Sequence, residues 1–284
     1  MAVTDTRSSP ARDPLAETAG AWLREAESLL RERGVDDPDA VHRVRQMITR
    51  ARSALRLIRE AIDRAEFDEL DPDLRAAAHA LSGRRDRQVA TETLDRLARG
   101  ASRKSERRAI RAAARAIGGV NETVRPVGAT AAELADRLAA IAPRVRAQIE
   151  GCSSKTVRRG LRRSFRTARR ARRLARREPT VGRLHDWRRR TRHLRNQVRW
   201  LAPDRSRGTR RRIHGLSELL GELNDLAVLE SLLDESKDID RDQRRSVARA
   251  IEAERRELLG ASSAISERVF GARAKRFSRR FLPS

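Results

Sequence analysis

The sequence predicts an all-α fold, and three observations lead to that prediction. From residue 15 onward, nearly every segment places its apolar residues at the i, i+3, i+4, i+7 spacing of amphipathic helices. No segment shows the sustained alternation of apolar and polar residues that marks a half-buried strand. Proline and glycine fall mostly between the periodic segments, where they end helices. The 284 residues are enough to bury a substantial core.

The first half of the chain is predicted to hold five helices. They are expected at about residues 15–33, 38–64, 72–82, 85–98 and 102–117. Asp71 and Pro72 form an N-cap and first-turn pair, which predicts the start of the third helix. Residues 1–14 are polar and are expected to be disordered, and residues 121–130 are predicted to be a linker.

The second half is predicted to hold six more helices and a basic tail. The helices are expected at about residues 131–150, 154–177, 181–201, 206–221, 223–235 and 240–268. Pro143 is expected to kink or break the first of them, and Thr180 is a candidate cap for the third. The tail, residues 271–284, is expected to be a frayed terminus. The chain is therefore divided into a first helical-bundle repeat at 15–120 and a second at 131–270.

The chain carries a positive charge that its own acidic groups cannot neutralise. Lysine and arginine number 65 against 40 aspartate and glutamate residues, so the formal net charge is +25. Such an excess raises the local concentration of polyanions and speeds their encounter with the protein. Nucleic acid, an anionic membrane and polyphosphate all fit this observation. Only 4 of the 65 are lysine, so a general preference for arginine would give the same composition, and the placement of the arginines has to decide.

Other features narrow the class of protein. The single cysteine, Cys152, excludes an intramolecular disulfide framework. No stretch approaches the roughly 18 apolar residues of a membrane span, and the polar N-terminus has no apolar signal-peptide core. We therefore expect a cytoplasmic protein. The three Trp and five Phe residues are scattered along the chain, which argues against a platform for stacking unpaired bases.

Two predicted helices, 143 residues apart, carry the same row of polar and basic residues, here called the ladder. Both ladders occupy offsets 0, +3, +7, +10 and +14, which fall within an arc of roughly 80° on a helix. The first ladder is His42, Arg45, Thr49, Arg52 and Arg56, and the second is His185, Arg188, Arg192, Arg195 and Arg199. Each helix therefore presents a row of hydrogen-bond donors on one side.

An apolar stripe repeats with the same offset, roughly 120° away from the ladder. The first stripe is Val41, Val44, Ile48, Ala51, Leu55 and Ile58, and the second is Leu184, Trp187, Thr191, Leu194, Val198 and Leu201. The agreement of histidine, ladder and stripe predicts an internal duplication. Each helix is expected to bury its stripe in a bundle and to turn its ladder elsewhere.

An aspartate follows each ladder helix, about 40 residues beyond its histidine. Arg85-Asp86 resembles Asn224-Asp225 in this respect. Asp86 and Asp225 could orient ladder guanidiniums through bidentate ion pairs. They could equally cap or solvate a helix N-terminus, where a carboxylate is favourable. The structural role is the preferred interpretation.

The predicted helix at 154–177 is the most basic part of the chain. Between Lys155 and Arg177 it has twelve basic residues and no acidic one. Like charges at i, i+4 on a helix repel, so we expect an anion to bind there. The arginines at the centre of its polar side are Arg162, Arg166, Arg169 and Arg173.

These motifs resemble the CHAD family, the histidine-containing α-helical domain associated with polyphosphate. The resemblance rests on VHRVRQMITRARSALR and LHDWRRRTRHLRNQVRWL, each followed by an R-D or N-D motif (RRDRQV and ELNDLAVL), and it covers roughly residues 15–268. It implies two pseudo-symmetric helical bundles of about four to five helices each. Between them it implies a basic central groove or pore that holds inorganic polyphosphate.

The resemblance also implies a set of polyphosphate-binding residues. The positions that it carries over are His42, Arg45, Arg50, Arg52, His185, Arg188, Arg189, Arg192 and Arg195. Arg56 and Arg199 extend the ladders, and the basic helix at 154–177 matches the family segment before the second motif. The sequence departs from the family pattern at two positions. Thr49 stands where the family usually has a basic residue, and His193 replaces an arginine or lysine at the position that matches Arg50.

We expect a binding protein without enzyme activity, located at polyphosphate granules. The sequence has no Gly-rich phosphate loop, and Glu252 to Arg256, the nearest string to an E-x-E-x-K strand, falls in a predicted helix. No histidine pair has metal-ligand spacing, so neither a metal nor a cofactor is expected. Two alternatives remain open: a nucleic-acid-binding protein that relies on phosphate contacts, and a scaffold whose tail, Arg273 to Phe281, lies on an anionic surface.

Overall fold

The computed structural model describes residues 13–81, 83–119, 130–150, 152–201, 206–236 and 238–282, with the side chains of 13–16, 83–86 and 119 left out. Within these ranges all regular secondary structure is helical, which confirms the predicted all-α class. None of the helices described is both long enough and apolar enough to cross a membrane. The predicted disordered N-terminus and most of the predicted linker lie outside the described residues.

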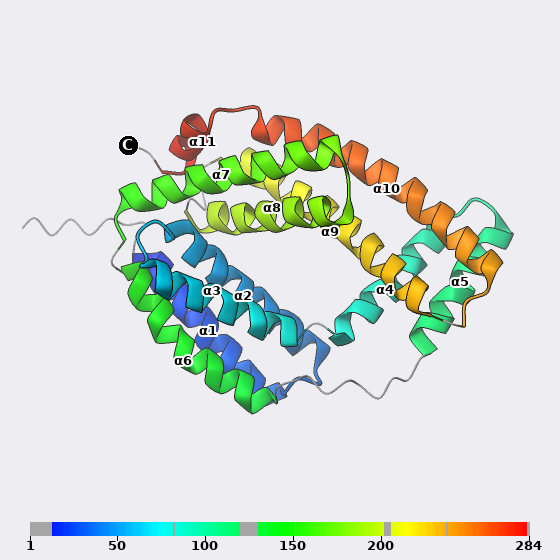
Figure 1. Cartoon of the computed structure of the whole chain (residues 1–284), viewed down its shortest axis with the longest axis horizontal. Coiled ribbons are helices and arrows are strands. Elements are labelled where there is room, and N and C mark those ends of the chain that lie inside the picture. Colours follow the sequence, from blue (N-terminus) through cyan, green and yellow to red (C-terminus); the bar gives the residue numbers. More distant parts are fainter. Residues whose placement is uncertain are drawn as a thin grey trace, which may run out of the picture.

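The described residues form eleven helices (Figure 1). They are α1 (Asp13–Arg33), α2 (Pro38–Ile58), α3 (Arg64–Ala80), α4 (Gly83–Gly100), α5 (Lys104–Gly119), α6 (Ala131–Glu150), α7 (Ser154–Arg177), α8 (Val181–Leu201), α9 (Arg207–Glu235), α10 (Arg241–Phe270) and α11 (Ala274–Phe281). Most predicted bounds agree with these to within a few residues, because helix periodicity and caps are local properties of the sequence.

The start of α3 was predicted wrongly. Asp63, and not Asp71, is its N-cap, and the Asp63 carboxylate accepts hydrogen bonds from the backbone N–H groups of Ala65 (2.8 Å) and Glu66 (3.3 Å). The helix therefore begins eight residues earlier than Asp71 suggested, with Pro72 inside it. The preceding helix, α2, correspondingly ends at Ile58 rather than near residue 64.

Three further expectations are corrected in the second half. Residues 207–235 form one continuous helix, α9, instead of two, and α6 is not broken at Pro143, where the alternative of a kink stays a prediction. The basic tail is not frayed, because residues 274–281 form α11. Phe277 and Phe281 of α11 are buried, and the Phe277 ring lies 4.3 Å from the ring of Phe165 on α7, measured between centroids.

The helices pack in groups that cross the order of the chain. At one end α1, α2, α3 and α6 pack together, and α7, α8 and α11 pack beside them with parts of α9 and α10 (Figure 1). The long helices α9 and α10 extend to the other end, where α4 and α5 pack on them. Thus α6, from the predicted second repeat, joins helices of the first, and α4 and α5 join helices of the second. The internal duplication and pseudo-symmetry stay predictions.

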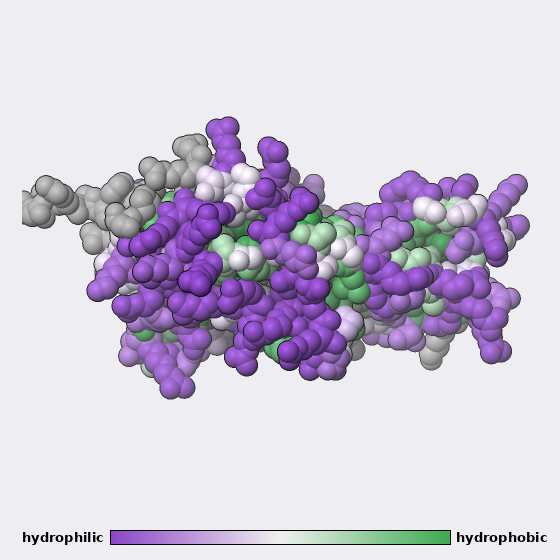
Figure 2. Space-filling view, turned by 90° about the horizontal axis from the view of Figure 1, so that it is seen from above, coloured by the Kyte–Doolittle hydropathy of each residue, from purple (hydrophilic) through white to green (hydrophobic). Residues whose placement is uncertain are grey.

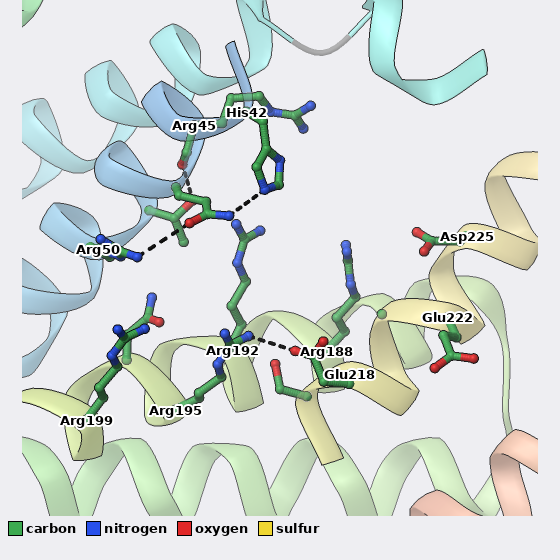
Figure 3. Close-up of a pocket in the computed structure, with 15 residues that line it drawn as sticks. His42, Arg45, Arg50, Arg188, Arg192, Arg195, Arg199, Glu218, Glu222 and Asp225 are labelled. Atoms are coloured by element: carbon green, nitrogen blue, oxygen red, sulfur yellow. Dashed lines mark hydrogen bonds and ion pairs between the residues drawn. The ribbon is translucent and has the colours of Figure 1, made fainter. Parts of the chain in front are cut away.

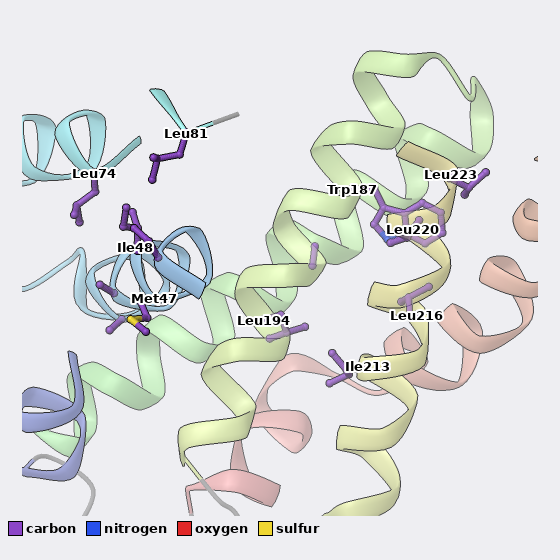
Figure 4. Close-up of a cluster of buried hydrophobic side chains, with 14 of the residues drawn as sticks. Met47, Ile48, Leu74, Leu81, Trp187, Leu194, Ile213, Leu216, Leu220 and Leu223 are labelled. Carbon is purple, nitrogen blue, oxygen red and sulfur yellow. The ribbon is translucent and has the colours of Figure 1, made fainter. Parts of the chain in front are cut away.

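The predicted apolar stripes do form the core at the junction of these groups. Every residue of the α2 stripe is buried, and on α8 Trp187, Thr191, Leu194 and Val198 are buried while Leu184 and Leu201 are partly buried. Figure 4 shows Trp187 and Leu194 packed with leucine side chains of α9, and the α2 side chains facing those of α3. On the outside, hydrophilic side chains cover most of the face formed by α7, α10 and α11 (Figure 2).

Helices α2 and α8 are also joined by buried polar contacts centred on Ser53. The Ser53 hydroxyl donates to the carbonyl oxygen of Thr49 at 2.7 Å, and it accepts from the Asn196 amide at 3.0 Å. The His193 Nδ1 atom lies 2.8 Å from the same hydroxyl, and the Gln197 amide donates to the Ser53 carbonyl oxygen at 2.9 Å. Because the Ser53 proton is directed at Thr49, His193 Nδ1 is assigned as a donor.

Gly160 allows α7 to cross α2 closely. A Cβ atom at this position would lie 1.6 Å from the carbonyl oxygen of Leu57, so a side chain would force the two helices apart. Gly182, near the start of α8, has no atom within 4 Å of the corresponding position.

We predict that Gly160→Ala destabilises the fold, whereas Gly182→Ala leaves its stability unchanged or slightly raised. Overpacking a close contact costs roughly 1–3 kcal/mol, more than the gain of about 1 kcal/mol when alanine replaces glycine in a helix. Urea denaturation of the two variants measures the difference. Equal stability of both variants would show that α2 and α7 do not cross at Gly160.

Candidate polyanion-binding pocket

A pocket of about 410 Å³ lies between α2, α8 and α9 (Figure 3). Helix α2 contributes part of the first ladder to its lining, and α8 contributes most of the second. The lining residues are His42, Arg45, Gln46, Thr49, Arg50, Arg188, Arg192, Arg195, Asn196, Arg199, Ser217, Glu218, Gly221, Glu222 and Asp225. Six of the fifteen are arginines, so the pocket is strongly cationic on its α2 and α8 walls.

The α8 wall is the predicted ladder in its expected arrangement. Arg188, Arg192, Arg195 and Arg199 are separated by four, three and four residues, which places them on one face of the helix. Figure 3 shows Arg188 and Arg192 reaching from α8 toward α2. On α2 the ladder members His42, Arg45 and Thr49 line the pocket, and the Thr49 hydroxyl donates to the carbonyl oxygen of Arg45 at 2.8 Å.

Arg192 is the central cation of the pocket. Its side chain has no hydrogen bond or ion pair with the part of the chain that the structure describes. Desolvation, and then the charges of Arg188, Arg45 and Arg195 in that order, together lower its pKa to about 10. A guanidinium that is partly buried and surrounded by like charges has an unfavourable electrostatic free energy, which an anion would relieve.

Arg50 extends the cationic surface beyond the ladder. Its guanidinium carbon lies 5.9 Å from the centre of the Trp22 ring, and Arg50 donates to the Gln46 side chain at 3.4 Å. Burial lowers the pKa of Arg50, and the nearby charge of Arg199 contributes in the same direction. The Gln46 amide also contacts the Nε2 atom of His42.

Carboxylates of α9 form the opposite wall. Glu218 accepts a hydrogen bond from Arg195 at 3.0 Å, and Glu222 pairs with Arg96 of α4 at 3.4 Å. Asp225 completes this wall, while the side chain of Asp86 lies outside the described residues. Whether Asp225 orients a guanidinium or has the preferred structural role stays a prediction. Six arginines against three carboxylates leave an excess of three positive charges with His42 neutral (6 − 3 = 3).

A model of the CHAD domain family matches residues 15–234 of the chain. This protein belongs to the CHAD family. The match ends inside α9, earlier than the expected residue 268, so α10 and α11 lie beyond the matched part of the CHAD domain. No curated protein and no solved structure matches the chain. Within the described residues of the CHAD chain, no group of three or more His, Cys, Asp or Glu side chains could hold a metal ion.

Two predicted ladder residues of this CHAD chain do not line the pocket. Arg52 and Arg56 both donate to the Asp71 carboxylate of α3, with Nε–Oδ1 distances of 3.1 Å and 3.0 Å. Asp71 is only 6 % exposed. These arginines therefore anchor α2 to α3. The sequence did contain one signal of this arrangement, because Asp71 falls on the apolar face of α3 together with Phe67 and Leu74.

Two predicted binding residues at the α8 end are held outside the pocket. His185 is exposed and its Nδ1 atom lies 3.1 Å from the Asn224 side-chain oxygen. Arg189 donates to Asp186 at 2.7 Å. His193, the departure from the family pattern, is buried against α2; burial, and then the charges of Arg56 and Arg52, keep its pKa well below the ordinary value, so it is neutral.

The basic helix α7 lies on the side of α8 away from the pocket (Figure 3). None of its described residues lines the pocket, although Arg162, Arg166, Arg169 and Arg173 were predicted to bind the same ligand. Arg162 donates to the hydroxyl of Ser278 on α11 at 2.9 Å. The other three are exposed at the surface.

We predict that Asp71→Asn destabilises the fold by about 3 kcal/mol at neutral pH, because breaking a buried ion pair leaves uncompensated charge. Burial alone would raise the pKa of Asp71, but the hydrogen bonds and charges of Arg52 and then Arg56 outweigh it, so the pKa is lowered on folding. The contribution of the Asp71 carboxylate to the free energy of unfolding is complete above about pH 5, and it declines as the pH falls through the lowered pKa.

Urea denaturation at pH 7 and pH 3 tests this prediction. The native protein loses stability on acidification, and Asp71→Asn loses less, because one acid-sensitive pair is already gone. Asp68→Asn is the matched control, since Asp68 is exposed on the same helix and, among the described residues, pairs with Arg64 alone at 3.5 Å. An Asp71 variant as stable at pH 7 as the Asp68 variant would contradict the assigned role.

Proposed function

We propose that this CHAD chain binds inorganic polyphosphate in the pocket between α2, α8 and α9. The observation that carries the proposal is Arg192, a partly buried guanidinium that faces other arginines and has no carboxylate partner among the described residues. In a stable fold, such a group is favourable only when an anion reaches it. Membership of the CHAD family, which is associated with polyphosphate, agrees with that chemistry.

The shape and chemistry of the lining suit a flexible chain of phosphates. Guanidinium groups bind phosphate oxygens through paired N–H donors, and arginine does this better than lysine. Two walls supply such donors, Arg45 and Arg50 from α2 and the α8 ladder opposite them. A linear anion can contact both walls in turn, whereas a single isolated phosphate would leave most of the donors unused.

The α9 wall limits how the chain lies in the pocket. Glu218, Glu222 and Asp225 repel phosphate, so the ligand follows the α2 and α8 walls. Arg195 is held by Glu218 in the free protein, and this exposed pair exchanges for an arginine–phosphate pair when the ligand enters. Surface pairs of this kind are worth less than about 1 kcal/mol, so the exchange costs little.

Binding takes place without chemical conversion of the ligand. The pocket supplies hydrogen-bond donors, and its histidine, His42, contacts the side-chain amide of Gln46. A protein of this kind holds or organises polyphosphate, and a location at polyphosphate granules in the cytoplasm follows from the proposal.

A competition experiment tests the choice of ligand. Labelled polyphosphate bound to the full chain is displaced with unlabelled polyphosphate, duplex DNA or RNA at matched phosphate concentration and near-physiological salt. We predict that polyphosphate competes at least about tenfold better, a difference of about 1.4 kcal/mol. Equal competition by all three would remove the support for a polyphosphate pocket.

We predict opposite effects of Arg192→Gln on binding and on stability. Polyphosphate affinity falls at least about tenfold, while the ligand-free fold becomes more stable by about 1–2 kcal/mol because a buried, repelled charge is removed. The matched control is Arg52→Gln, which leaves Asp71 with one partner fewer and lowers stability. Titration calorimetry and urea denaturation measure the two effects. Loss of stability in Arg192→Gln would mean that its guanidinium has a partner within the protein.

A further inference from the structure

Helix α7 presents a row of arginines that the fold leaves without partners. Arg166, Arg169, Arg170, Arg173 and Arg177 are exposed, and none has an ion pair or side-chain hydrogen bond with the described part of the chain. From Arg166 to Arg177 the row spans about 16 Å at the rise of an α-helix. It is therefore a straight ridge of positive charge.

Helix α11 widens this ridge. Its Arg276 and Arg279 are exposed, as are Lys275 and the preceding Arg273, and the described residues offer none of the four an ion pair. The stacked rings of Phe277 and Phe165, and the hydrogen bond from Arg162 to Ser278, fix α11 against α7. The nine basic side chains of the two helices thus belong to one rigid surface, which we call the α7–α11 face.

Acidic groups at the borders of this face are already engaged. Glu178, which follows Arg177, pairs with Arg183 of α8 at 2.6 Å. Glu267 of α10 pairs with Arg172 at 3.5 Å and with Arg176 at 2.9 Å. At the other border Glu60 pairs with Arg163 at 3.2 Å. The arginines at the borders of the face are therefore paired with carboxylates, while those at its centre are not. The positive charges at the centre raise the local electrostatic potential.

The α7–α11 face is separate from the polyphosphate pocket. Helix α8 lies between them, and none of the described residues of α7 or α11 lines the pocket. Helix α11 also lies beyond the part of the chain that the CHAD family model matches. A ligand of this face therefore need not be the ligand of the pocket.

We propose that the α7–α11 face is a second binding surface, which takes the phosphate backbone of double-stranded nucleic acid without regard to sequence. Guanidinium and ammonium groups replace the counterions condensed on the duplex, and the release of those counterions supplies the binding free energy. The proposal does not depend on the polyphosphate pocket.

The geometry of the face favours a duplex over a flexible polyanion. A duplex carries about one charge per 1.7 Å of its axis and stays straight over about 150 base pairs, so it meets a 16 Å ridge without losing conformational entropy. A flexible chain would lose conformational entropy on being ordered along this exposed row. An interfacial membrane helix needs an apolar face, but the phenylalanines of α11 are buried.

The test compares two variants of the full chain with equal charge. One replaces Arg166, Arg169, Arg170 and Arg173 on α7 with glutamine. The control replaces four exposed arginines at the far end, Arg99, Arg108, Arg111 and Arg115, with glutamine, and both variants have a net charge of +21 (25 − 4 = 21). Fluorescence anisotropy with a labelled 30-base-pair duplex of mixed sequence measures affinity over a series of salt concentrations.

We expect the α7 variant to lose at least about tenfold in duplex affinity and the control less than about threefold. The slope of log affinity against log salt falls by about 3 to 4 in the α7 variant, at about 0.9 for each phosphate contact removed. Arg192→Gln, in the pocket, leaves duplex binding unchanged. Circular dichroism checks that both fourfold variants keep their helix content.

Two results would overturn the proposal. Equal losses in the two fourfold variants would show that the duplex responds to net charge alone and not to this face. Tighter binding of the native chain to vesicles with anionic lipid than to the duplex, lost in the α7 variant, would assign the face to a membrane surface. In that case Leu174 and Val181, which are 38 % and 61 % exposed at one end of the row, would be its apolar contacts.

Discussion

The contact between α2 and α8 is the constraint on which the pocket depends, because it holds two rows of like charge face to face. Ser53 is at its centre and is bound by His193, Asn196 and Gln197 of α8. The apolar stripe of α2 packs toward α3 and that of α8 packs toward α9, which leaves the pocket-lining members of the two ladders on facing walls. The cationic pocket is therefore fixed by buried contacts and not by mobile surface side chains. Repulsion among its arginines is a cost that the rest of the core offsets.

Much of this could be predicted from the sequence, because helix faces follow from local spacing. The all-α class, both apolar stripes and the α8 wall of the pocket were found in this way. Arg52 and Arg56 share the ladder spacing but bind Asp71, because spacing along α2 does not reveal that α3 packs beside it. For the same reason the sequence did not predict which helices α6 and α11 pack against, since their partners are distant in the sequence.

Arginine has three different roles in this fold, and the residue type alone does not distinguish them. Arg52 and Arg56 are structural, because both pair with the same buried carboxylate, that of Asp71. Arg192 is partly buried and surrounded by like charge. Arg169 is exposed and has no ion pair or side-chain hydrogen bond with the described residues. What separates the three is the tertiary partner, which explains why a count of basic residues predicts a polyanion ligand but not its site.

Arg192 and Arg169, which represent the two kinds of arginine without a carboxylate partner, should also bind anions differently. An exposed guanidinium such as Arg169 is hydrated and screened, so an incoming phosphate replaces water and small ions, and the gain shrinks as salt rises. Arg192 has already lost much of its hydration on folding, and salt screens a buried charge much less. An anion at Arg192 therefore offsets the unfavourable free energy of desolvating this guanidinium on folding. By this reasoning the pocket binds tightly and resists salt, while the α7–α11 face binds more weakly and responds to ionic strength.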